Sequence, residues 1–443
     1  MTTDIQHHVN QLYPTLVQWR RDFHKHAETG WLEFRTASLV AQRLASWGYL
    51  VQAGREVIDE HARMGVPTQE VLTREEQRAL EQGADPNWLP YFSGGLTGVV
   101  GILDTGRPGP TIGFRFDMDA LDLHESADES HLPAALGFRS INENMMHACG
   151  HDAHTTIGLG VAHTLAQIKD RLSGRIKLIF QPAEEGVRGA KAMVAVGVVD
   201  DLQLFFASHV GVNHPLGEVV CGANGYLATT KLNVSYTGAA AHAGGSPEEG
   251  KNALLAAATA ALNLHGIARH SAGSSRINVG VLQAGSGRNI VPASAQLKLE
   301  TRGETSEINQ YVLDRALRII RGAAAMYDVT ETIEIVGEAQ TCNSSPALFP
   351  FVRAQAAQVE GIHSIVELAQ AGGSEDATTM MARVQQNGGL ASYVYFGTTL
   401  AAGHHKETFD IDEKVLGIAV KTLSLCALHA AQLERQDGQA ATD

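Results

Sequence analysis

Short apolar segments alternate with helical ones along the first half of the chain, and this order leaves few architectures open. Residues 97–103, 111–116 and 176–180 are apolar runs bounded by Gly or Pro, which is typical of buried strands. Residues 5–21 and 155–168 have the apolar spacing expected of helices. Because neighbouring parallel strands need a crossover connection, the alternation predicts an α/β domain whose mostly parallel sheet carries helices on both faces.

The pattern changes near Gly225. Residues 231–236 alternate apolar and polar side chains, as in a strand with one face exposed to water. Strands and helices then follow in the order β-α-β-β-α-β, which indicates an antiparallel sheet with two helices on one face. The α/β pattern returns afterwards. We therefore predict a discontinuous domain formed by residues 1–225 and 338–443, interrupted by a ferredoxin-like α+β domain over residues 226–337.

The net charge of the chain limits the kinds of partner that it can bind. The chain of 443 residues carries 34 Lys and Arg against 48 Asp and Glu, a formal net charge of −14 at pH 7. Affinity for nucleic acid requires clustered basic side chains, so we expect no nucleic-acid partner. A small anionic substrate needs only a few local donors and is compatible with this charge.

Neither a signal peptide nor a membrane span is expected. The first residues have no basic stretch followed by an apolar core, and no apolar run approaches the ~18 residues that cross a bilayer. The four cysteines are far apart and follow no pairing pattern, which predicts free thiols in a reducing compartment. We therefore expect a cytoplasmic protein with no membrane partner.

The densest group of chemically active side chains lies in the segment MHACGHDAH. From His147 to His154 it holds three His, one Cys and one Asp. A single Cys is usually a small buried residue and a single His is rarely a ligand. Here Gly150, between Cys149 and His151, lets the backbone turn and aim both side chains at one point. Thiolate and neutral imidazole are preferred ligands of borderline divalent metals, so the segment predicts a metal site.

Two adjacent carboxylates, Glu184 and Glu185, follow a predicted strand in the segment QPAEEG. They repel each other, and a strand end tolerates both if a cation neutralises one of them. A solvated charge pair in a loop is the alternative. In the metal-site interpretation, Glu185 binds metal, and Glu184 accepts a proton from the attacking water and returns it to the leaving group.

Further candidates follow other predicted strands. His209, His405 and the pair Asp117 and Asp119 each come after such a segment. In open α/β folds, ligands bind at the carboxyl edge of the sheet. We therefore expect these side chains to converge there with the two segments described above.

The insert carries its own candidates for substrate binding. His242 stands among Ala and Gly residues in GAAAHAGG, where small neighbours would let a ligand approach closely, although a helix start alone accounts for the motif. Arg288 and Asn289 offer a guanidinium and an amide on a Gly-rich turn, which suits a carboxylate. An ordinary turn is the alternative.

In this order, the motifs resemble the M20 family of metallopeptidases, specifically its amidohydrolase branch with the sequence CGHD. The likeness runs over almost the whole chain, through RRDFH, DMDAL, CGHD, QPAEEG, GAAAHAG, GSED and a final His405 with Phe409. Each motif alone is weak, whereas the ordered set is specific. Two positions depart from the family pattern: Ala27 replaces a common Pro, and Lys406 and Glu407 replace the usual Ser-Pro.

The resemblance implies a site for two divalent metal ions, Mn or Zn. The ligands it implies are a bridging Cys149 thiolate with His151, Glu185, His209 and His405. It further implies that Glu184 is the general base and acid, and that Asp119 orients a metal ligand.

The resemblance also implies that the insert is a lid and dimerisation domain, in a homodimer or in a heterodimer with a related B subunit. His242 would reach the scissile carbonyl, in its own or the partner subunit's site, and Asn289 with Arg288 would hold the free carboxylate of a small anionic substrate. The implied reaction is metal-dependent hydrolysis of an N-acyl amino acid, with p-aminobenzoyl-glutamate as the expected substrate. Alternatives are another aromatic conjugate such as indole-acetyl-aspartate, a cysteine hydrolase with Cys149 as nucleophile, and a non-catalytic, metal-loaded binding subunit.

Overall fold

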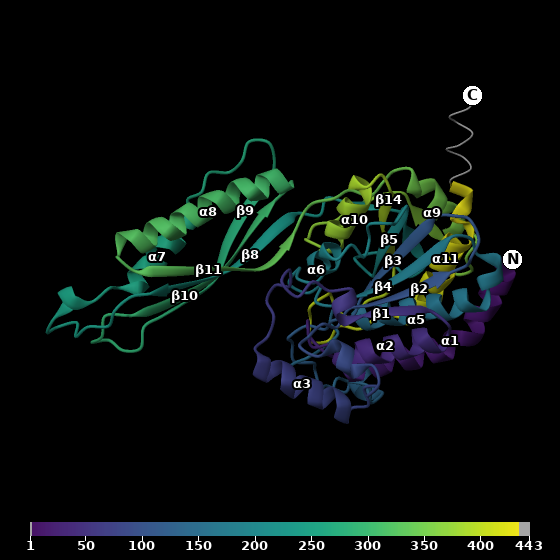
Figure 1. Ribbon diagram of the computed structural model, residues 1–443, viewed down its shortest axis with the longest axis horizontal. Helices are drawn as coiled ribbons and strands as arrows, with labels where there is room; N and C mark the ends of the chain where they lie inside the picture. The colour runs from purple at the N-terminus through teal and green to yellow at the C-terminus, as the bar shows by residue number, and fades with distance from the viewer. Residues whose placement is uncertain (1, 434–443) are drawn as a thin grey trace.

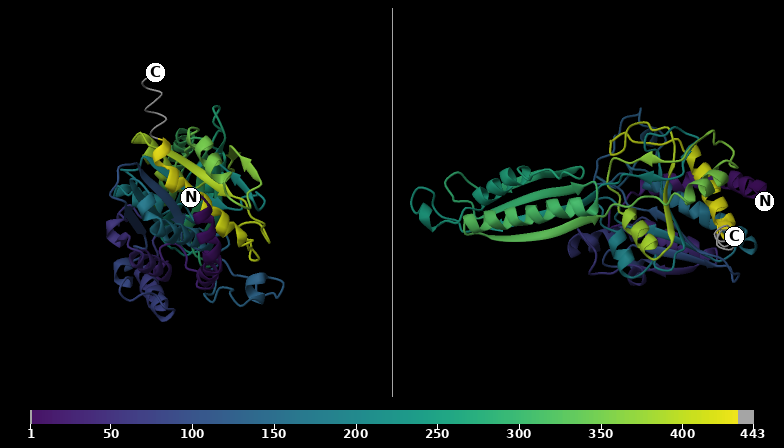
Figure 2. Two further views of the ribbon diagram at one scale, coloured as in Figure 1. Left: turned by 90° about the vertical axis from the view of Figure 1, so that its right-hand side faces the viewer. Right: turned by 90° about the horizontal axis from the view of Figure 1, so that it is seen from above.

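The computed structural model describes residues 2–433. The polar composition of residues 436–443 predicts a frayed end of the chain, and these residues lie outside the described range. The molecule is elongated, with a large body and a narrower arm that extends from one side of it (Figure 1). The first and last helices pack against each other in the body, whereas a continuous segment from the middle of the chain forms the arm (Figures 1 and 2).

The body is built on one large mixed sheet. Over the described residues it has eight strands, in the order β1 (Leu50–Ala53), β2 (Val99–Asp104), β4 (Arg175–Gln181), β3 (Thr111–Asp117), β5 (Leu204–Val210), β14 (Leu390–Phe396), β6 (Glu218–Val220) and β12 (Ser364–Val366). The central strands β4, β3, β5 and β14 are parallel, and the pairs β1–β2, β2–β4 and β14–β6 are antiparallel. A small separate sheet pairs β7 (Ala223–Asn224) with β13 (Ala369–Gln370). The predicted, mostly parallel sheet is confirmed, with antiparallel strands towards its margins.

Helices cover both faces of this sheet, as predicted. One face packs against α1 (Thr2–Lys25), α2 (Phe34–Ser46), α5 (His151–Gln167), α9 (Leu348–Ala356) and α11 (Lys414–His429), and the other against α6 (Ala190–Ala195) and α10 (Ala377–Gln386). Phe205 and Phe206, adjacent on β5, belong to the two different cores. A strand buried on both faces needs apolar side chains at every position, which explains the continuous apolar runs in the sequence. No helix within residues 2–433 has the length and apolar character needed to cross a membrane.

Two elements near the carboxyl edge of the sheet extend further than predicted. α5 begins at His151 rather than near residue 155, because Gly150 adopts a left-handed conformation (φ 93°) immediately before it. β5 continues to Val210, so His209 lies within the strand and not after it. Both extensions bring candidate ligands onto regular, well-anchored backbone.

The segment 56–87 is charged and compatible with helix, so its sequence predicts a helical excursion on the surface, but the structure is less helical than that. Only α3 (Gln69–Glu81) forms within it, and turns, including one through Gly65 (φ 58°), occupy much of the remainder. Other short helices in the body are α4 (Leu132–Ala135) and the 3-10 segments η1 (Gly54–Glu56), η2 (Leu89–Phe92) and η3 (Lys169–Arg171).

The arm is an antiparallel α+β unit with its own core. Its four strands, all within the described chain, lie in the order β11 (Thr330–Ala339), β8 (Ala228–Thr237), β10 (Ser294–Gly303) and β9 (Ser275–Ala284). α7 (Ala253–His265) and α8 (Ser306–Met326) cover one face, and the short η4 (Pro247–Glu249) precedes α7. The chain order β8-α7-β9-β10-α8-β11 confirms the predicted α+β class of the insert. The domain boundary assigned to it, residues 226–337, stays a prediction.

Candidate metal centre

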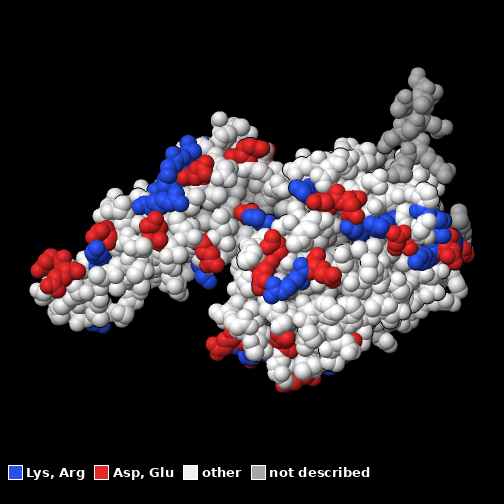
Figure 3. All heavy atoms as spheres, in the orientation of Figure 1, with Lys and Arg blue, Asp and Glu red and all other residues white. Residues whose placement is uncertain are grey.

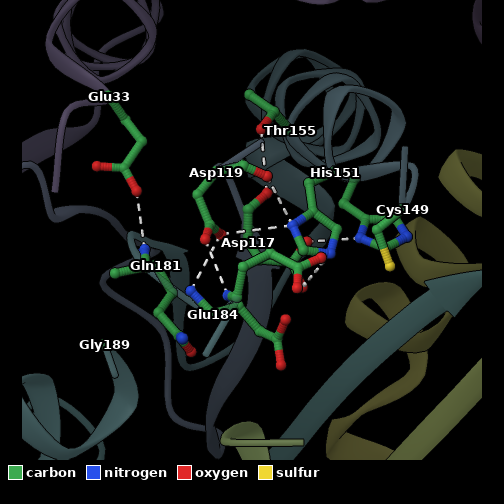
Figure 4. A network of polar contacts seen from close by, with 12 residues as sticks. Glu33, Asp117, Asp119, Cys149, His151, Thr155, Gln181, Glu184 and Gly189 are labelled. Carbon is green, nitrogen blue, oxygen red and sulfur yellow. Dashed lines mark hydrogen bonds and ion pairs between the residues drawn. The ribbon is translucent and has the colours of Figure 1, made fainter. Parts of the chain in front are cut away.

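The candidate site lies at the carboxyl edge of the parallel strands. β3 ends at Asp117, and the loop after it carries Asp119; the loop after β4 carries Glu184 (Figure 4). The start of α5 contributes His151, with Cys149 in the turn before it. This is the edge at which ligands bind in open α/β sheets.

The five residues predicted to bind metal form two groups that share one member. Cys149, His151 and His209 can each offer a ligand atom within 4.8 Å of the others, and so can Cys149, Glu185 and His405. The Cys149 sulfur lies 3.4 Å from Nε2 of His209, and Nε2 of His405 lies 3.4 Å from Oε1 of Glu185. Cys149 is therefore the residue that the two groups share, and its role as a bridging ligand stays a prediction.

Residues with unusual backbone conformations lie at or next to the candidate ligands. Gly150 is left-handed, and a Cβ atom on it would lie only 2.8 Å from Cγ2 of Val210, so a larger residue would clash. Ala183 (φ 53°), just before the carboxylate pair, and His405 (φ 64°) are non-glycine residues with positive φ. Such residues cost about 1–3 kcal/mol each and concentrate at functional sites, where surrounding contacts hold them.

Asp119 holds two segments of the site together. Its carboxylate accepts hydrogen bonds from the backbone N–H groups of Glu184 (3.0 Å) and Glu185 (2.8 Å). Its carbonyl oxygen accepts a hydrogen bond from Nδ1 of His151 (2.8 Å), and Figure 4 shows these contacts around Asp119. Because Nδ1 is engaged in this way, Nε2 is the ring nitrogen that His151 can offer to a metal.

Two buried polar atoms in the site, Nε2 of His151 and Oε1 of Glu185, form no hydrogen bond within the described residues. Their ion-pair contacts are long, 3.8 Å from Nε2 of His151 to Asp117 and 3.4 Å from Oε1 of Glu185 to His405. Buried polar atoms nearly always form hydrogen bonds, so these two require an explanation. Both are ligand atoms for divalent cations, and the sulfur, nitrogen and oxygen donors of the two groups suit Zn or Mn. The residues present therefore fit a metal centre.

The three histidines of the MHACGHDAH segment have different surroundings. His154 is fully engaged, since Nδ1 pairs with Asp117 (2.5 Å) and Nε2 accepts the N–H of Val210 (3.0 Å). His147 is buried without hydrogen bonds from either ring nitrogen in the part of the chain described, and burial lowers its pKa to about 3, so its ring is neutral. His151 alone of the three belongs to a group with Cys149.

Glu184 is buried in acidic surroundings. One of its oxygens lies within 4.8 Å of ligand-type oxygens of Glu375 and Asp376, which share Arg115 as a cationic partner at 3.1 Å each. Burial first, and then the negative charge of Glu375, hold the pKa of Glu184 well above its ordinary value. A carboxyl group with a raised pKa can take up a proton and release it again, as a general base and acid must.

A cavity of about 340 Å³ opens onto these groups. Cys149 and Glu184 line its body side together with tyrosine side chains, and the arm contributes Lys231 and Arg302. A second cavity of about 590 Å³, between body and arm, also includes Glu185 and Lys231 in its wall. Figure 3 shows that the molecule is hollowed between body and arm. The two adjoining cavities have the size of sites that bind small organic ligands.

The three predicted substrate-binding residues do not lie in this site. His242, Arg288 and Asn289 are exposed on loops at the distal end of the arm, where His242 pairs with Ile290 in an isolated bridge. β8 leaves the body at its first residue and reaches these loops only after its tenth, a strand length of roughly 30 Å. The arm therefore carries them away from the site formed by the body of the same chain.

Other residues at the site escaped the sequence interpretation. Nδ1 of His404 lies 3.7 Å from the Cys149 sulfur, and its adjacency to His405 was the only signal in the sequence. Arg302 and Lys231 line the cavity from neighbouring strands of the arm. The alternation of side chains along each strand predicts that Arg302 and Lys231 lie on one face of the arm sheet, but it does not predict which part of the molecule that face contacts.

Comparisons with known proteins show which family and which relatives this chain resembles. Residues 113–429 match Peptidase family M20/M25/M40. The chain is 60% identical over 422 residues to the A subunit of p-aminobenzoyl-glutamate hydrolase from Escherichia coli (strain K12), covering 95% of this chain and 97% of that protein. It is 58% identical over 426 residues to indole-3-acetyl-aspartic acid hydrolase of Enterobacter agglomerans, covering 96% and 98%. The crystal structure of the aminobenzoyl-glutamate utilization protein from Klebsiella pneumoniae matches with a TM-score of 0.84 at 53% identity, covering 96% of this chain and 98% of that one.

These matches confirm two expectations drawn from the motif order. The relatives named as hydrolases match almost from end to end, so the protein is a hydrolytic enzyme. The family match spans the parallel strands of the body, the complete arm and the last helix. The chain therefore belongs to Peptidase family M20/M25/M40.

Proposed function

We propose that this protein hydrolyses the amide bond of N-acyl amino acids that join an aromatic acyl group to an acidic amino acid, with p-aminobenzoyl-glutamate as the first candidate. The observation that carries the proposal is the pair of ligand groups that share Cys149 beside the buried Glu184. The name of one relative supports p-aminobenzoyl-glutamate, and the name of the other supports indole-3-acetyl-aspartate as the second candidate.

Two divalent cations, Mn or Zn, are the cofactors we propose for this site. Their ligands would be Cys149 in both groups, with His151 and His209 in one and Glu185 and His405 in the other. When bound, the cations would supply the Lewis acidity that polarises the amide carbonyl and favours deprotonation of water. Asp119 would act as a positioning residue, because it fixes His151 and the loop of Glu185 relative to each other.

Glu184 would carry the proton in the reaction. Its carboxylate takes a proton from the attacking water as the oxygen bonds to the amide carbon, and the protonated form delivers it to the nitrogen as the C–N bond breaks. The neighbouring Glu375 and Asp376 favour the protonated form between these two steps. Arg302 lines the arm side of the cavity; Glu300 engages its Nε and Nη2, and its Nη1 would bind a free carboxylate of the substrate.

We propose that residues 226–337 serve as a lid and dimerisation domain. Because His242, Arg288 and Asn289 lie at the distal end of the arm, they would act in the site of a second protomer. The Escherichia coli relative is named as one subunit of its enzyme, which supports a partner here, either a second copy or a related B subunit. The four unpaired, buried cysteines support a cytoplasmic location.

Turnover of p-aminobenzoyl-glutamate by the metal-reconstituted protein is the direct test, with indole-3-acetyl-aspartate assayed in parallel. We expect release of the amino acid, loss of activity with a chelator, and recovery when Mn or Zn is added. Full activity under chelation would instead indicate a cysteine hydrolase, with Cys149 as nucleophile and His209 (3.4 Å) as its base. A protein that binds metal but cleaves no conjugate would be a non-catalytic binding protein, and the proposal would be wrong.

A further inference from the structure

The open face of the arm sheet forms one wall of the cleft. Along β8, Leu232 and Val234 are buried beneath the helices of the arm, whereas Lys231 and Asn233 point to the opposite face and are half-buried. Lys231 and Asn233 both line the larger cavity, and Lys231 also lines the smaller one that contains Cys149. Lys231 is therefore a cationic side chain of the arm that lines the same cavity as the candidate ligands Cys149 and Glu185.

Lys231 has no carboxylate partner of its own within the described residues. Its direct neighbour across the ladder is Glu300 on β10, but no ion pair joins the two. Glu300 instead forms a two-point contact with Arg302, at 3.0 Å and 3.2 Å. No salt bridge connects Lys231 to any acidic side chain in the described range 2–433. A half-buried ammonium group left unpaired beside a cavity is well suited to an anionic ligand.

Two cationic side chains on the same face of the arm sheet suit a ligand with two negative charges. Arg302 lies two residues beyond Glu300 on the same face, so it is the diagonal neighbour of Lys231. Diagonal neighbours in an antiparallel pair lie roughly 7–8 Å apart, and both side chains are long enough to adjust this distance. An N-acyl glutamate or aspartate presents two carboxylates on its amino-acid half, one on the main chain and one on the side chain.

We infer that Lys231 binds the side-chain carboxylate of the acidic amino acid while Arg302 binds the main-chain carboxylate, so that Lys231 selects glutamate and aspartate conjugates over neutral ones. This inference rests on the proposed function. An uncharged side chain such as that of glutamine would leave the ammonium group of Lys231 without a counter-charge in a partly desolvated site. Sites built around a charged partner discriminate strongly against ligands that lack it.

The test compares p-aminobenzoyl-glutamate with p-aminobenzoyl-glutamine, which have nearly the same shape and differ by one charge. We expect the wild-type protein to prefer the glutamate conjugate, and Lys231→Met to lower kcat/KM for it by about 10- to 100-fold while leaving the glutamine conjugate unchanged. Lys231→Arg, which keeps the charge, should retain most of the preference. Lys414→Met is the control, because Lys414 lies in the body, pairs with Asp412 (3.6 Å) and lines neither of the two cavities.

The test distinguishes a failure of the inference about Lys231 from a failure of the proposed function. If Lys231→Met leaves the preference for the glutamate conjugate intact, or lowers kcat/KM equally for both conjugates, the inference is wrong and the hydrolase function stands. The same holds if the wild-type protein cleaves both conjugates equally well. If the wild-type protein cleaves neither conjugate nor any other N-acyl amino acid, the proposed function itself is wrong. Thermal melting of each variant establishes that it is folded, and Lys231→Gln replaces Lys231→Met if the latter is not.

Discussion

Replacing Asp119 by Asn should disable the candidate centre without unfolding the protein. The carboxylate of Asp119 accepts the backbone N–H groups of Glu184 at 3.0 Å and of Glu185 at 2.8 Å. An Asn side chain has one acceptor oxygen, so one of these amides would lose its partner and face an NH₂ group. Losing a charge-assisted hydrogen bond and leaving a buried donor unpaired costs about 2–3 kcal/mol.

That cost should appear as a loss of activity, because the loop held by Asp119 carries both carboxylates of the site. Since 1.4 kcal/mol corresponds to a factor of ten, we expect kcat/KM for p-aminobenzoyl-glutamate to fall by about 30- to 150-fold. Steady-state kinetics of the metal-loaded protein, with metal content measured by elemental analysis, provide the assay. Asp314→Asn is a control, because this exposed carboxylate on α8 accepts a hydrogen bond from Gln310 far from the site. An Asp119→Asn protein as active as wild type would refute the reasoning.

Glu184→Gln should keep its metal and lose roughly 10²- to 10⁴-fold in kcat, measured with metal content in parallel; substantial residual activity would count against its role as proton carrier. Cys149→Ala should lower the amount of bound metal found by elemental analysis after dialysis, and an unchanged content would contradict a shared thiolate ligand. Stability should depend on pH through His24: burial alone would lower its pKa, but hydrogen bonds to Asp152 (2.8 Å) and Glu125 (2.9 Å) raise it from 6.5 to about 9. Because the folded pKa lies above the unfolded one, this stabilisation, on the order of 3 kcal/mol, is complete below the unfolded value and is lost as the pH rises through the folded value. Denaturant unfolding across this pH range should show a steeper decline for wild type than for His24→Asn, and equal slopes would exclude His24 as the source.

Local patterns were sufficient for the order of elements and for part of the site. The runs at 111–116 and 176–180 became β3 and β4, because strands buried on both faces must be apolar at every position. Cys149 and His151 could be assigned to one site from the sequence, since only a glycine separates them and the turn that it permits is local. The switch to period-two alternation near Gly225 likewise marked the arm, whose sheet has one covered and one open face.

Which remote residues meet was decided by the tertiary structure alone. Arg288 and Lys231 both belong to the arm, yet Lys231 lines the cavity and Arg288 is exposed at the far end. Alternation determines the face of a strand on which a side chain lies, whereas its distance from another segment depends on which end of that strand joins the body. His405 and Cys149 are also brought together only by the tertiary structure. They lie in loops that follow different parts of the chain, and such loops become neighbours only when the parallel strands have assembled into the sheet.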